Sequence, residues 1–508
     1  MSARRFVGNV IWNWIAIAVN IATGIILTPF ILKKLGEENF GLWAFAISLA
    51  EYYWIMDFGF RSATIKYAAH YSTTGENDKV NEILNTALFY SSCIGPIILA
   101  ANFFILPHVF SNTQTRNPLF LKLVTVVAGA WVLGSLFNVF TGCLEGFQRF
   151  DLINRIALTG SLFRSCGTAI LLWRGYGVYE MALMTLASQA MVHLLSLLAF
   201  RHVFPDIRFS RIFVKFSAMK TMLRYGSHSV VASIAQRVVN QGAPLVIGYF
   251  LPLRFVGYYA SSSRVIDYTV DGITRIGQVA SPNAAEMIAR NNQSRLVNLS
   301  VIVNRYGLAI YLPLSIFVLV YGHALLSVYL NPSFALSSAP VLMILAIGAT
   351  IATAGQYNSS SILFGMGRHQ IYSRALLVEA LVLIASLTLV VPKFGVIGAA
   401  CVIAGLMILN RGLFTAFLIS RELHVGYAWF LASVYQPLVA AIPVGILMYA
   451  LRVTVLPGKN WFQLILAGLI VVVCYAPLAF LFSVQPAHRQ ALLAKLQQLG
   501  PTRFTQHA

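Results

Sequence analysis

Long apolar runs separated by short polar connections dominate the pattern along the chain. A helix needs about 20 mostly apolar residues to cross the hydrocarbon core of a bilayer. Membrane barrels show alternating segments of about ten residues instead, so continuous runs predict helices. We therefore expect an all-α polytopic membrane protein with about 14 transmembrane helices. The runs are 6–32, 40–61, 83–107, 119–143, 152–173, 178–200, 226–251, 256–280, 299–320, 335–365, 370–391, 396–420, 430–453 and 461–483.

The composition agrees with this prediction and excludes the soluble classes. Hydrophobic residues make up 58% of the chain and charged residues 10%, whereas soluble domains carry about 25% charged residues. A disordered chain needs low hydrophobicity, and a water-soluble enzyme has no means of burying this much apolar surface. The first run is too long for the apolar core of a signal peptide, so we expect a retained helix.

The positive charge indicates topology. The chain has 36 Lys and Arg residues against 16 Asp and Glu, a net charge of +20. If the N-terminus is cytoplasmic, 21 of the 36 lie on the cytoplasmic side, 9 lie on the other side and 6 arginines lie inside the runs. Cytoplasmic loops carry the excess of Lys and Arg. We therefore expect both termini in the cytoplasm, and nucleic acid is not an expected partner.

Two segments combine basic and apolar side chains outside the runs. The connection 201–225 alternates arginines and lysines with phenylalanines and other apolar residues, and the tail 485–508 is similar. Such stretches bind the anionic inner leaflet of a membrane. We expect both segments to lie along membrane lipids, with an ordinary solvated linker as the alternative for 201–225.

Short matches at a spacing of about 218 residues indicate an internal duplication. Arg5-Phe6-Val7-Gly8 matches Arg224-Tyr225-Gly226, and Leu144-x-Gly146-x-x-Arg149 matches Leu363-x-Gly365-x-x-Arg368. Each copy holds six runs, an even number, so the two copies insert in the same orientation as parallel repeats. The expected domains are an N-terminal six-helix lobe (1–200), a linker (201–225), a C-terminal six-helix lobe (226–421), two additional helices (422–484) and a tail (485–508).

The N-terminal lobe carries a glycine pattern typical of one family. Leu35-Gly36-x-x-x-Phe40-Gly41 is followed by Asp57-Phe58-Gly59. With the two six-helix lobes, this resembles the polysaccharide-transporter branch of the multidrug/oligosaccharidyl-lipid/polysaccharide exporter superfamily, which includes the O-antigen flippases. The resemblance implies MATE-like, V-shaped lobes around a hydrophilic cavity in the bacterial cytoplasmic (inner) membrane. It also implies a cargo of oligosaccharide linked to polyprenyl diphosphate, with polysaccharide-assembly proteins as candidate partners.

Four charged residues lie in the single run 256–280, namely Arg264, Asp267, Asp271 and Arg275. Each would cost about 2.5–3.5 kcal/mol at the centre of a lipid-exposed helix. Most of them fall on one helical face, so we expect a polar stripe that lines a water-filled space. In the alternative interpretation, i,i+3 and i,i+4 pairs neutralise each other and only stabilise the bundle.

Other runs carry polar residues on one face. Guanidinium groups match the paired oxygens of a diphosphate, and Arg237 has no acidic residue one turn away on its own helix. The predicted substrate-binding residues are Arg237, Arg264, Arg275, Asp271, Asn240, Gln236, Asn13, Asn20 and Arg164. The candidates for coupling to a proton or sodium ion are Glu51, Asp57, Asp267, Asp271 and Glu379.

Catalytic motifs are absent from the sequence. No GxxxxGK[ST], HExxH or GxSxG pattern occurs, and the five cysteines show no CxxC spacing. We expect no enzyme activity, catalytic residue, metal or cofactor. The favoured function is a flippase for a lipid-linked oligosaccharide of O-antigen, capsule or exopolysaccharide, working by alternating access. The alternatives are an ion-coupled multidrug exporter, a peptidoglycan-precursor flippase and, less favoured, a membrane sugar transferase or polymerase.

Overall fold

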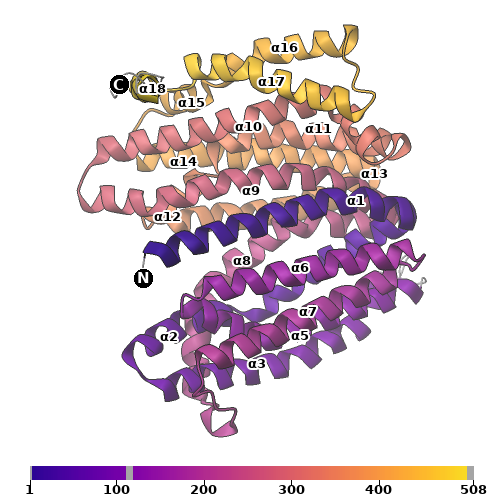
Figure 1. The fold of residues 1–508 in the computed structure, drawn as a ribbon, viewed down its shortest axis with the longest axis vertical. Coiled ribbons are helices and arrows are strands. Elements are labelled where there is room, and N and C mark those ends of the chain that lie inside the picture. Colours follow the sequence, from indigo (N-terminus) through magenta and orange to yellow (C-terminus); the bar gives the residue numbers. More distant parts are fainter. Residues whose placement is uncertain (1–2, 110–117, 500–508) are drawn as a thin grey trace, which may run out of the picture. The chain divides into compact units, whose positions relative to one another are not determined.

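The structure is a computed structural model that describes residues 3–109 and 118–499. Within these ranges, side chains are described except at 3–17, 109, 118, 227–229, 276, 278–279, 369, 492–493 and 495–499. Every regular element in the described part of the chain is a helix, which confirms the all-helical fold (Figure 1).

Contacts divide the chain into two compact units. The first holds Met1–Ala260 and Leu376–Ala399, and the second holds Ser261–Ala375 and Ala400–Ala508. Helices α9 (Leu253–Ala289) and α13 (His369–Leu406) contribute to both units. The predicted lobes 1–200 and 226–421 have different bounds and stay a prediction.

The first unit consists of helices that pack around α5. Figure 1 shows α3, α5 and α7 side by side, and α5 also contacts α2, while α8 packs along α1, α2 and α3. Their core includes Phe60, Val139, Phe140, Phe200 and Met222, all less than 9% exposed. The elements are α1 Ala3–Tyr53, η1 Trp54–Asp57, α2 Phe60–Thr74, α3 Asn77–Phe104, α4 Leu106–Val109, α5 Pro118–Gly146, α6 Phe150–Trp173, α7 Val178–Val203, η2 Arg211–Phe213 and α8 Phe216–Phe250.

The second unit is built on the packing of α10 against α11. Helix α10 also contacts α15, α16 and α17, and α11 packs on the π-helical segment η3. A bend separates α15 from α16, where the carbonyl of Ser433 accepts a hydrogen bond from Arg305 Nε at 2.6 Å. The elements are α10 Gln293–Tyr329, α11 Pro332–Gly355, α12 Ser359–Gly365, η3 Met407–Phe414, α14 Thr415–Glu422, α15 Tyr427–Tyr435, α16 Leu438–Thr454, α17 Trp461–Phe482 and α18 Pro486–Leu499.

Over the described residues, nine helical stretches are long and apolar enough to cross a membrane, or ten if the bent pair α15 and α16 is one span. The predicted number of fourteen is therefore not confirmed. Two of the nine, Ala18–Asp57 and Gln370–Glu422, each join two predicted runs, because each consists of two helices that meet at a kink where Gly36 or Gly395 has non-helical backbone angles. Helices α8 and α9 are not among the nine, since their many polar side chains lower their hydropathy.

The turns that follow α5 and α12 share one backbone pattern. The N–H of Arg149 donates to the carbonyl of Leu144 at 2.9 Å, and the N–H of Arg368 donates to that of Leu363 at 2.8 Å. The residue before each arginine has a positive φ, 55° in the first turn and 72° in the second. These positions are the ones aligned by the sequence match, so the turns support the parallel repeat, which stays a prediction.

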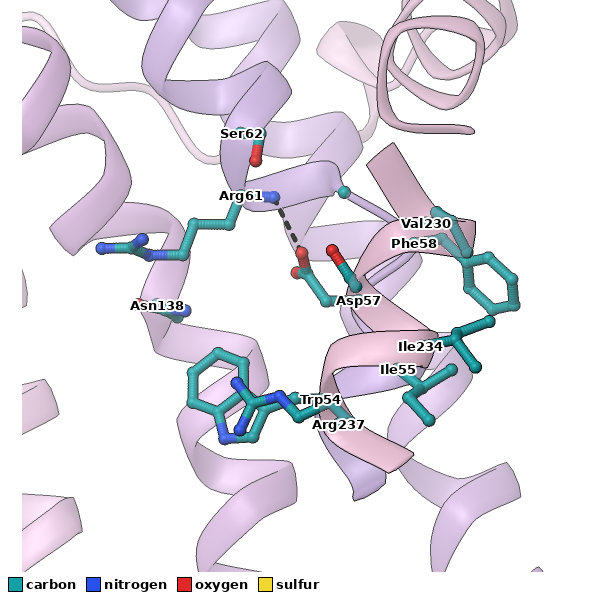
Figure 2. A pocket seen from close by; sticks show the side chains of 12 residues that line it. Trp54, Ile55, Asp57, Phe58, Arg61, Ser62, Asn138, Val230, Ile234 and Arg237 are labelled. Carbon is teal, nitrogen blue, oxygen red and sulfur yellow. Dashed lines mark hydrogen bonds between the residues drawn. The ribbon is translucent and has the colours of Figure 1, made fainter. Parts of the chain in front are cut away.

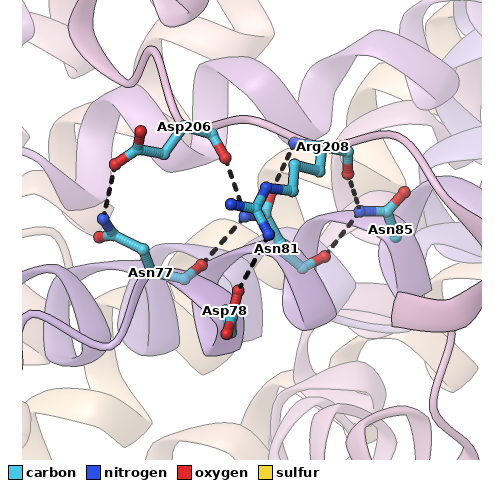
Figure 3. A network of polar contacts seen from close by, with 6 residues as sticks. All are labelled: Asn77, Asp78, Asn81, Asn85, Asp206 and Arg208. Carbon is cyan, nitrogen blue, oxygen red and sulfur yellow. Dashed lines mark hydrogen bonds and ion pairs between the residues drawn. The ribbon is translucent and has the colours of Figure 1, made fainter.

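The linker between α7 and α8 is extended and is fastened to α3 by two asparagines (Figure 3). Asn81 donates to the carbonyl of Asp206 at 3.1 Å and accepts the N–H of Arg208 at 2.9 Å. Asn85 donates to the carbonyl of Arg208 at 2.7 Å and accepts the N–H of Ser210 at 3.1 Å. The two amides thus bind alternate peptide groups of the linker, as a neighbouring strand would.

The same linker exposes apolar and basic side chains. Phe209, Ile212 and Phe216 are 51%, 75% and 79% exposed, and Arg211 and Lys215 are also exposed. Because the backbone on both sides of Phe209 is bound to α3 in the first unit, this side chain is presented from a fixed segment. Contact with the inner leaflet stays a prediction for this segment.

Replacing both Asn81 and Asn85 with alanine is expected to speed amide hydrogen exchange at Arg208 and Ser210 by about tenfold, because each N–H loses an acceptor worth about 0.5–1.5 kcal/mol. Hydrogen exchange followed by mass spectrometry measures this. Asn77→Ala is the matched control, because Asn77 binds the carboxylate of Asp206 and no linker amide. Unchanged exchange in the double variant would contradict the fastening role.

Candidate functional site

The first part of the site is a break in the helical stretch between α1 and α2. Helix α1 passes into the 3-10 turn η1, and the helical backbone is interrupted at Phe58 and Gly59, with φ of 44° and 76°. A positive φ costs a non-glycine residue about 1–2 kcal/mol. Asp57 lies in this turn and accepts the backbone N–H of Arg61 at 3.2 Å. Its negative charge is favourable there, at the N-terminus of α2.

Helix α8 contacts this break at Gly226, ten residues after its first residue. A Cβ atom on Gly226 would lie 2.2 Å from the carbonyl oxygen of Phe58, and one on Gly59 would lie 2.5 Å from the Cα of Gly226. Only a pair of glycines permits this backbone approach. The contact brings the polar side chains of α8 next to those of η1 and α2.

These elements and α5 enclose a cavity of about 440 Å³ (Figure 2). Its wall combines two guanidinium groups, one carboxylate, a tryptophan ring and small polar side chains. The lining residues are Trp54, Ile55, Asp57, Phe58, Gly59, Arg61, Ser62, Asn138, Val230, Ser233, Ile234 and Arg237. Every one of them belongs to the first unit.

Each arginine of the cavity pairs with a carboxylate from another helix. Arg61 Nη2 lies 2.7 Å from Glu145 Oε2 of α5, and Arg237 pairs with Glu51 of α1. The four side chains are between 28% and 39% exposed, so they remain accessible to water while paired. Because these pairs are partly exposed, we expect each to be weak, so that a competing anion can replace either carboxylate.

The structure brings several predicted residues together here. Arg237 and Asp57 line the cavity, and Glu51 binds Arg237. On α8, Gln236 Nε2 donates to Asn240 Oδ1 at 3.0 Å, so these two amides partly satisfy each other beside the arginine.

Other predicted residues lie elsewhere in the first unit. Asn20 of α1 accepts a hydrogen bond from Ser161 of α6 at 2.5 Å, and the exposed Arg164 follows Ser161 on the same helix. Glu379 is 3% exposed, on α13. None of these lines the cavity. Asn13 falls among the side chains outside the described part of the chain.

The charged stripe of α9 belongs to the second unit. Arg264, Asp267 and Asp271 are exposed and Arg275 is half-exposed. Among the described residues, none of the four forms an ion pair within 4.0 Å, and the guanidinium of Arg264 lies 5.9 Å from the ring centre of Tyr268. The i,i+3 and i,i+4 ion pairs of the alternative interpretation are therefore not formed within this distance.

Sequence reasoning missed Arg61, Glu145, Asn138 and Trp54. In the sequence, Glu145 is the variable position of the motif Leu144-x-Gly146-x-x-Arg149. The spacing of Arg61 four residues after Asp57 was the available signal. Within the described residues, no group of three or more His, Cys, Asp and Glu side chains is placed to hold a metal ion.

Comparison with known families finds a match over residues 34–339, to the family described as "Polysaccharide biosynthesis protein". The "Uncharacterized membrane protein EpsK" of Bacillus subtilis (strain 168) is 24% identical over 512 residues, covering 97% of this chain and 98% of that protein. The "Putative O-antigen transporter" of Shigella flexneri is 24% identical over 403 residues, covering 77% and 92%.

Solved structures share the fold. "Lipid II flippase MurJ, inward closed conformation" superposes with a TM-score of 0.70 at 12% identity, over 94% of this chain and all of that chain. An inward-facing multidrug resistance MATE family transporter of the MOP superfamily gives 0.66 at 15% identity, over 80% and 94%. At these identities the likeness concerns the fold alone, and it confirms the MATE-like architecture.

Proposed function

The chain is a multi-pass membrane protein that belongs to the polysaccharide biosynthesis protein family, and from this premise we propose that it is a flippase for a polyprenyl-diphosphate-linked oligosaccharide. The cargo would move from the cytoplasmic to the outer leaflet by alternating access. The relative described as a putative O-antigen transporter supports this cargo class. The observation that carries the proposal is the pair of water-accessible guanidinium groups in one cavity.

The two arginines suit a diphosphate head group. A guanidinium donates two parallel hydrogen bonds to phosphate oxygens, each shorter and stronger than a bond between neutral groups. In our proposal, Arg237 and Arg61 release Glu51 and Glu145 and bind the diphosphate instead. The lipid tail would stay in the bilayer while the head group occupies the cavity.

The charges around the cavity suggest how an ion could be coupled to transport. Three carboxylates, Glu51, Asp57 and Glu145, stand against the two arginines. An anionic head group would add further negative charge in a partly dry site, which is unfavourable. A proton or sodium ion at Glu51 or Asp57 would remove that repulsion, so we propose these two residues as the coupling sites.

Further residues would contact the cargo along its path. Polar side chains inside the membrane are costly unless they serve such a purpose. The proposed cargo-binding residues outside the cavity are Arg264, Arg275, Asp271, Asn240, Gln236, Asn13, Asn20 and Arg164. Asp267 and Glu379 remain further candidates for ion coupling.

The other transport functions differ in the charge they require. A drug exporter for organic cations would need an acidic, aromatic-lined cavity without arginines, so Arg61 and Arg237 disfavour it. A peptidoglycan-precursor flippase would use the same anion-binding groups, and it remains the second candidate. We propose no chemical step, and we place the protein in the inner membrane with both termini in the cytoplasm.

Deleting the gene is expected to strand the complete oligosaccharide-lipid on the cytoplasmic leaflet, because the head group has no other route across the membrane. Extraction of lipid-linked sugars, with leaflet assignment by an impermeant glycosidase, measures this. The returned wild-type gene is the control. Single repeat units on the outer leaflet would indicate a polymerase instead. An unchanged lipid pool with new sensitivity to cationic drugs would indicate a drug exporter.

A further inference from the structure

One wall of the cavity is not used by the diphosphate. It holds Trp54, a residue that is 37% exposed and lines the cavity. A tryptophan exposed within a cavity offers a flat apolar face and one N–H donor to whatever enters. No other lining residue has a ring of this size.

Aromatic neighbours hold Trp54 in place. The ring of Trp131 on α5 meets it edge-on, with the ring centres 6.0 Å apart and the planes at 89°. Tyr53 packs against the same Trp131 ring at 5.9 Å, and its hydroxyl donates to Asn102 of α3 at 2.6 Å. These contacts hold the Trp54 ring at the cavity wall before any ligand binds.

A second observation points to a polar ligand at the same wall. The Nδ2 group of Asn138, another lining residue, is buried and has no hydrogen-bond partner among the described residues. A buried donor without an acceptor costs about 1–3 kcal/mol. A movement of this side chain toward the cavity would let a ligand hydroxyl satisfy it.

Helix α5 orders these groups in a row. Trp131, Asn138 and Glu145 are seven residues apart, so they fall on nearly the same helical face. At 1.5 Å per residue, the row from Trp131 to Glu145 extends over about 21 Å. Arg61 binds Glu145 at one end and Trp54 packs on Trp131 at the other, with Asn138 between them.

We infer that the cavity recognises a sugar ring of the cargo as well as its diphosphate. The apolar C–H face of a pyranose stacks on Trp54, and a ring hydroxyl accepts the hydrogen bond of Asn138. A bare phosphate would use neither group, whereas a sugar has both an apolar face and hydroxyls. This inference rests on the proposed function, since it assigns the sugar-binding residues of the same site.

The test is equilibrium binding by the purified full chain in lipid nanodiscs. One ligand is polyprenyl diphosphate without sugar, and the other is the oligosaccharide-lipid extracted from cells that lack the gene. Trp54→Ala is expected to weaken binding of the sugar-bearing lipid by about tenfold and to leave the bare lipid within about twofold. Trp54→Phe should keep most of the affinity because it retains an aromatic face.

Two further variants keep the test decisive. Asn138→Leu, of similar volume, is expected to weaken only the sugar-bearing lipid, by about threefold or more. Trp173→Ala is the matched control, because Trp173 is 74% exposed at the end of α6 and does not line the cavity.

The outcomes separate this inference from the proposed function. If Trp54→Ala and Asn138→Leu weaken the binding of both lipids equally, or of neither, then Trp54 and Asn138 do not recognise a sugar ring. The flippase proposal would stand in that case. If the wild-type chain binds neither lipid, the proposed function fails and the inference fails with it.

Discussion

Arg237→Ala is expected to lower transport of the lipid-linked oligosaccharide by about 10- to 100-fold, because it removes charged hydrogen bonds worth about 1.5–3 kcal/mol to the diphosphate. Arg237→Lys should recover only part of the rate, since a lysine is a point charge without the two-pronged geometry. The measurement is leaflet-resolved lipid-linked sugar in cells that carry each variant at matched protein levels.

A second substitution distinguishes cargo binding from charge balance. In the structure, Arg237 also neutralises Glu51, so the alanine variant leaves a carboxylate unpaired. If pairing is the whole role of the arginine, Arg237→Ala combined with Glu51→Gln transports as well as Glu51→Gln alone, and the cargo-binding proposal is wrong. If the arginine binds the head group, the double variant transports less than Glu51→Gln alone.

Matched arginines provide the controls. Arg290→Ala should transport normally, because Arg290 pairs with Glu286 at the surface with its side chain 72% exposed.

Joint replacement of Arg264 and Arg275 by alanine tests the α9 stripe in the same assay. Transport is expected to be lost while membrane insertion is kept, and normal flux would exclude a cargo role for that stripe.

Gly41→Ala is expected to cause the largest loss of stability, about 3 kcal/mol or more, because the added methyl group has no room. Its Cβ would lie 1.9 Å from the carbonyl oxygen of Leu253 and 2.9 Å from the backbone nitrogen of Arg254. Backbone at the start of α9 cannot swing aside as the end of a flexible side chain can. Thermal unfolding in detergent and the yield of inserted protein measure the effect.

Gly129→Ala on α5 is the control for the same chemical change. A Cβ at Gly129 meets no atom within 4 Å, and alanine favours a helix by up to about 1 kcal/mol over glycine. We expect this variant to be as stable as the wild type or slightly more so. If Gly41→Ala unfolds at the same temperature as Gly129→Ala, then α1 and α9 do not approach as closely as the structure indicates.

The N-terminal glycine pattern was readable from the sequence, and the structure supplies its physical cause. Gly36 takes a φ of 75° at the kink of α1, and Gly41 allows α9 to approach. Gly59 combines a φ of 76° with the backbone contact to Gly226. Spacing alone identified the resemblance but did not show which glycine serves a turn and which serves a close approach.

The candidate site was predicted only in part. Arg237, Glu51 and Asp57 stood out because a charge in an apolar run is costly wherever it faces lipid. Their partners did not stand out, since Glu51 lies 186 residues before Arg237 and Glu145 lies 84 residues after Arg61. Arg237 has no acidic residue one turn away on its own helix, and its partner in the structure, Glu51, comes from α1 instead.

The sequence by itself determined that the chain spans a membrane and that its fold is all-helical, because hydropathy is a local property summed over about 20 residues. It did not determine the number of spans, since α8 and α9 match the predicted runs 226–251 and 256–280 but are not among the stretches apolar enough to cross a membrane, and α1 and α13 each join two predicted runs at a glycine kink. Only the tertiary structure decided which charges pair and where the cavity lies. Those facts depend on helix packing, which joins residues that no local pattern relates.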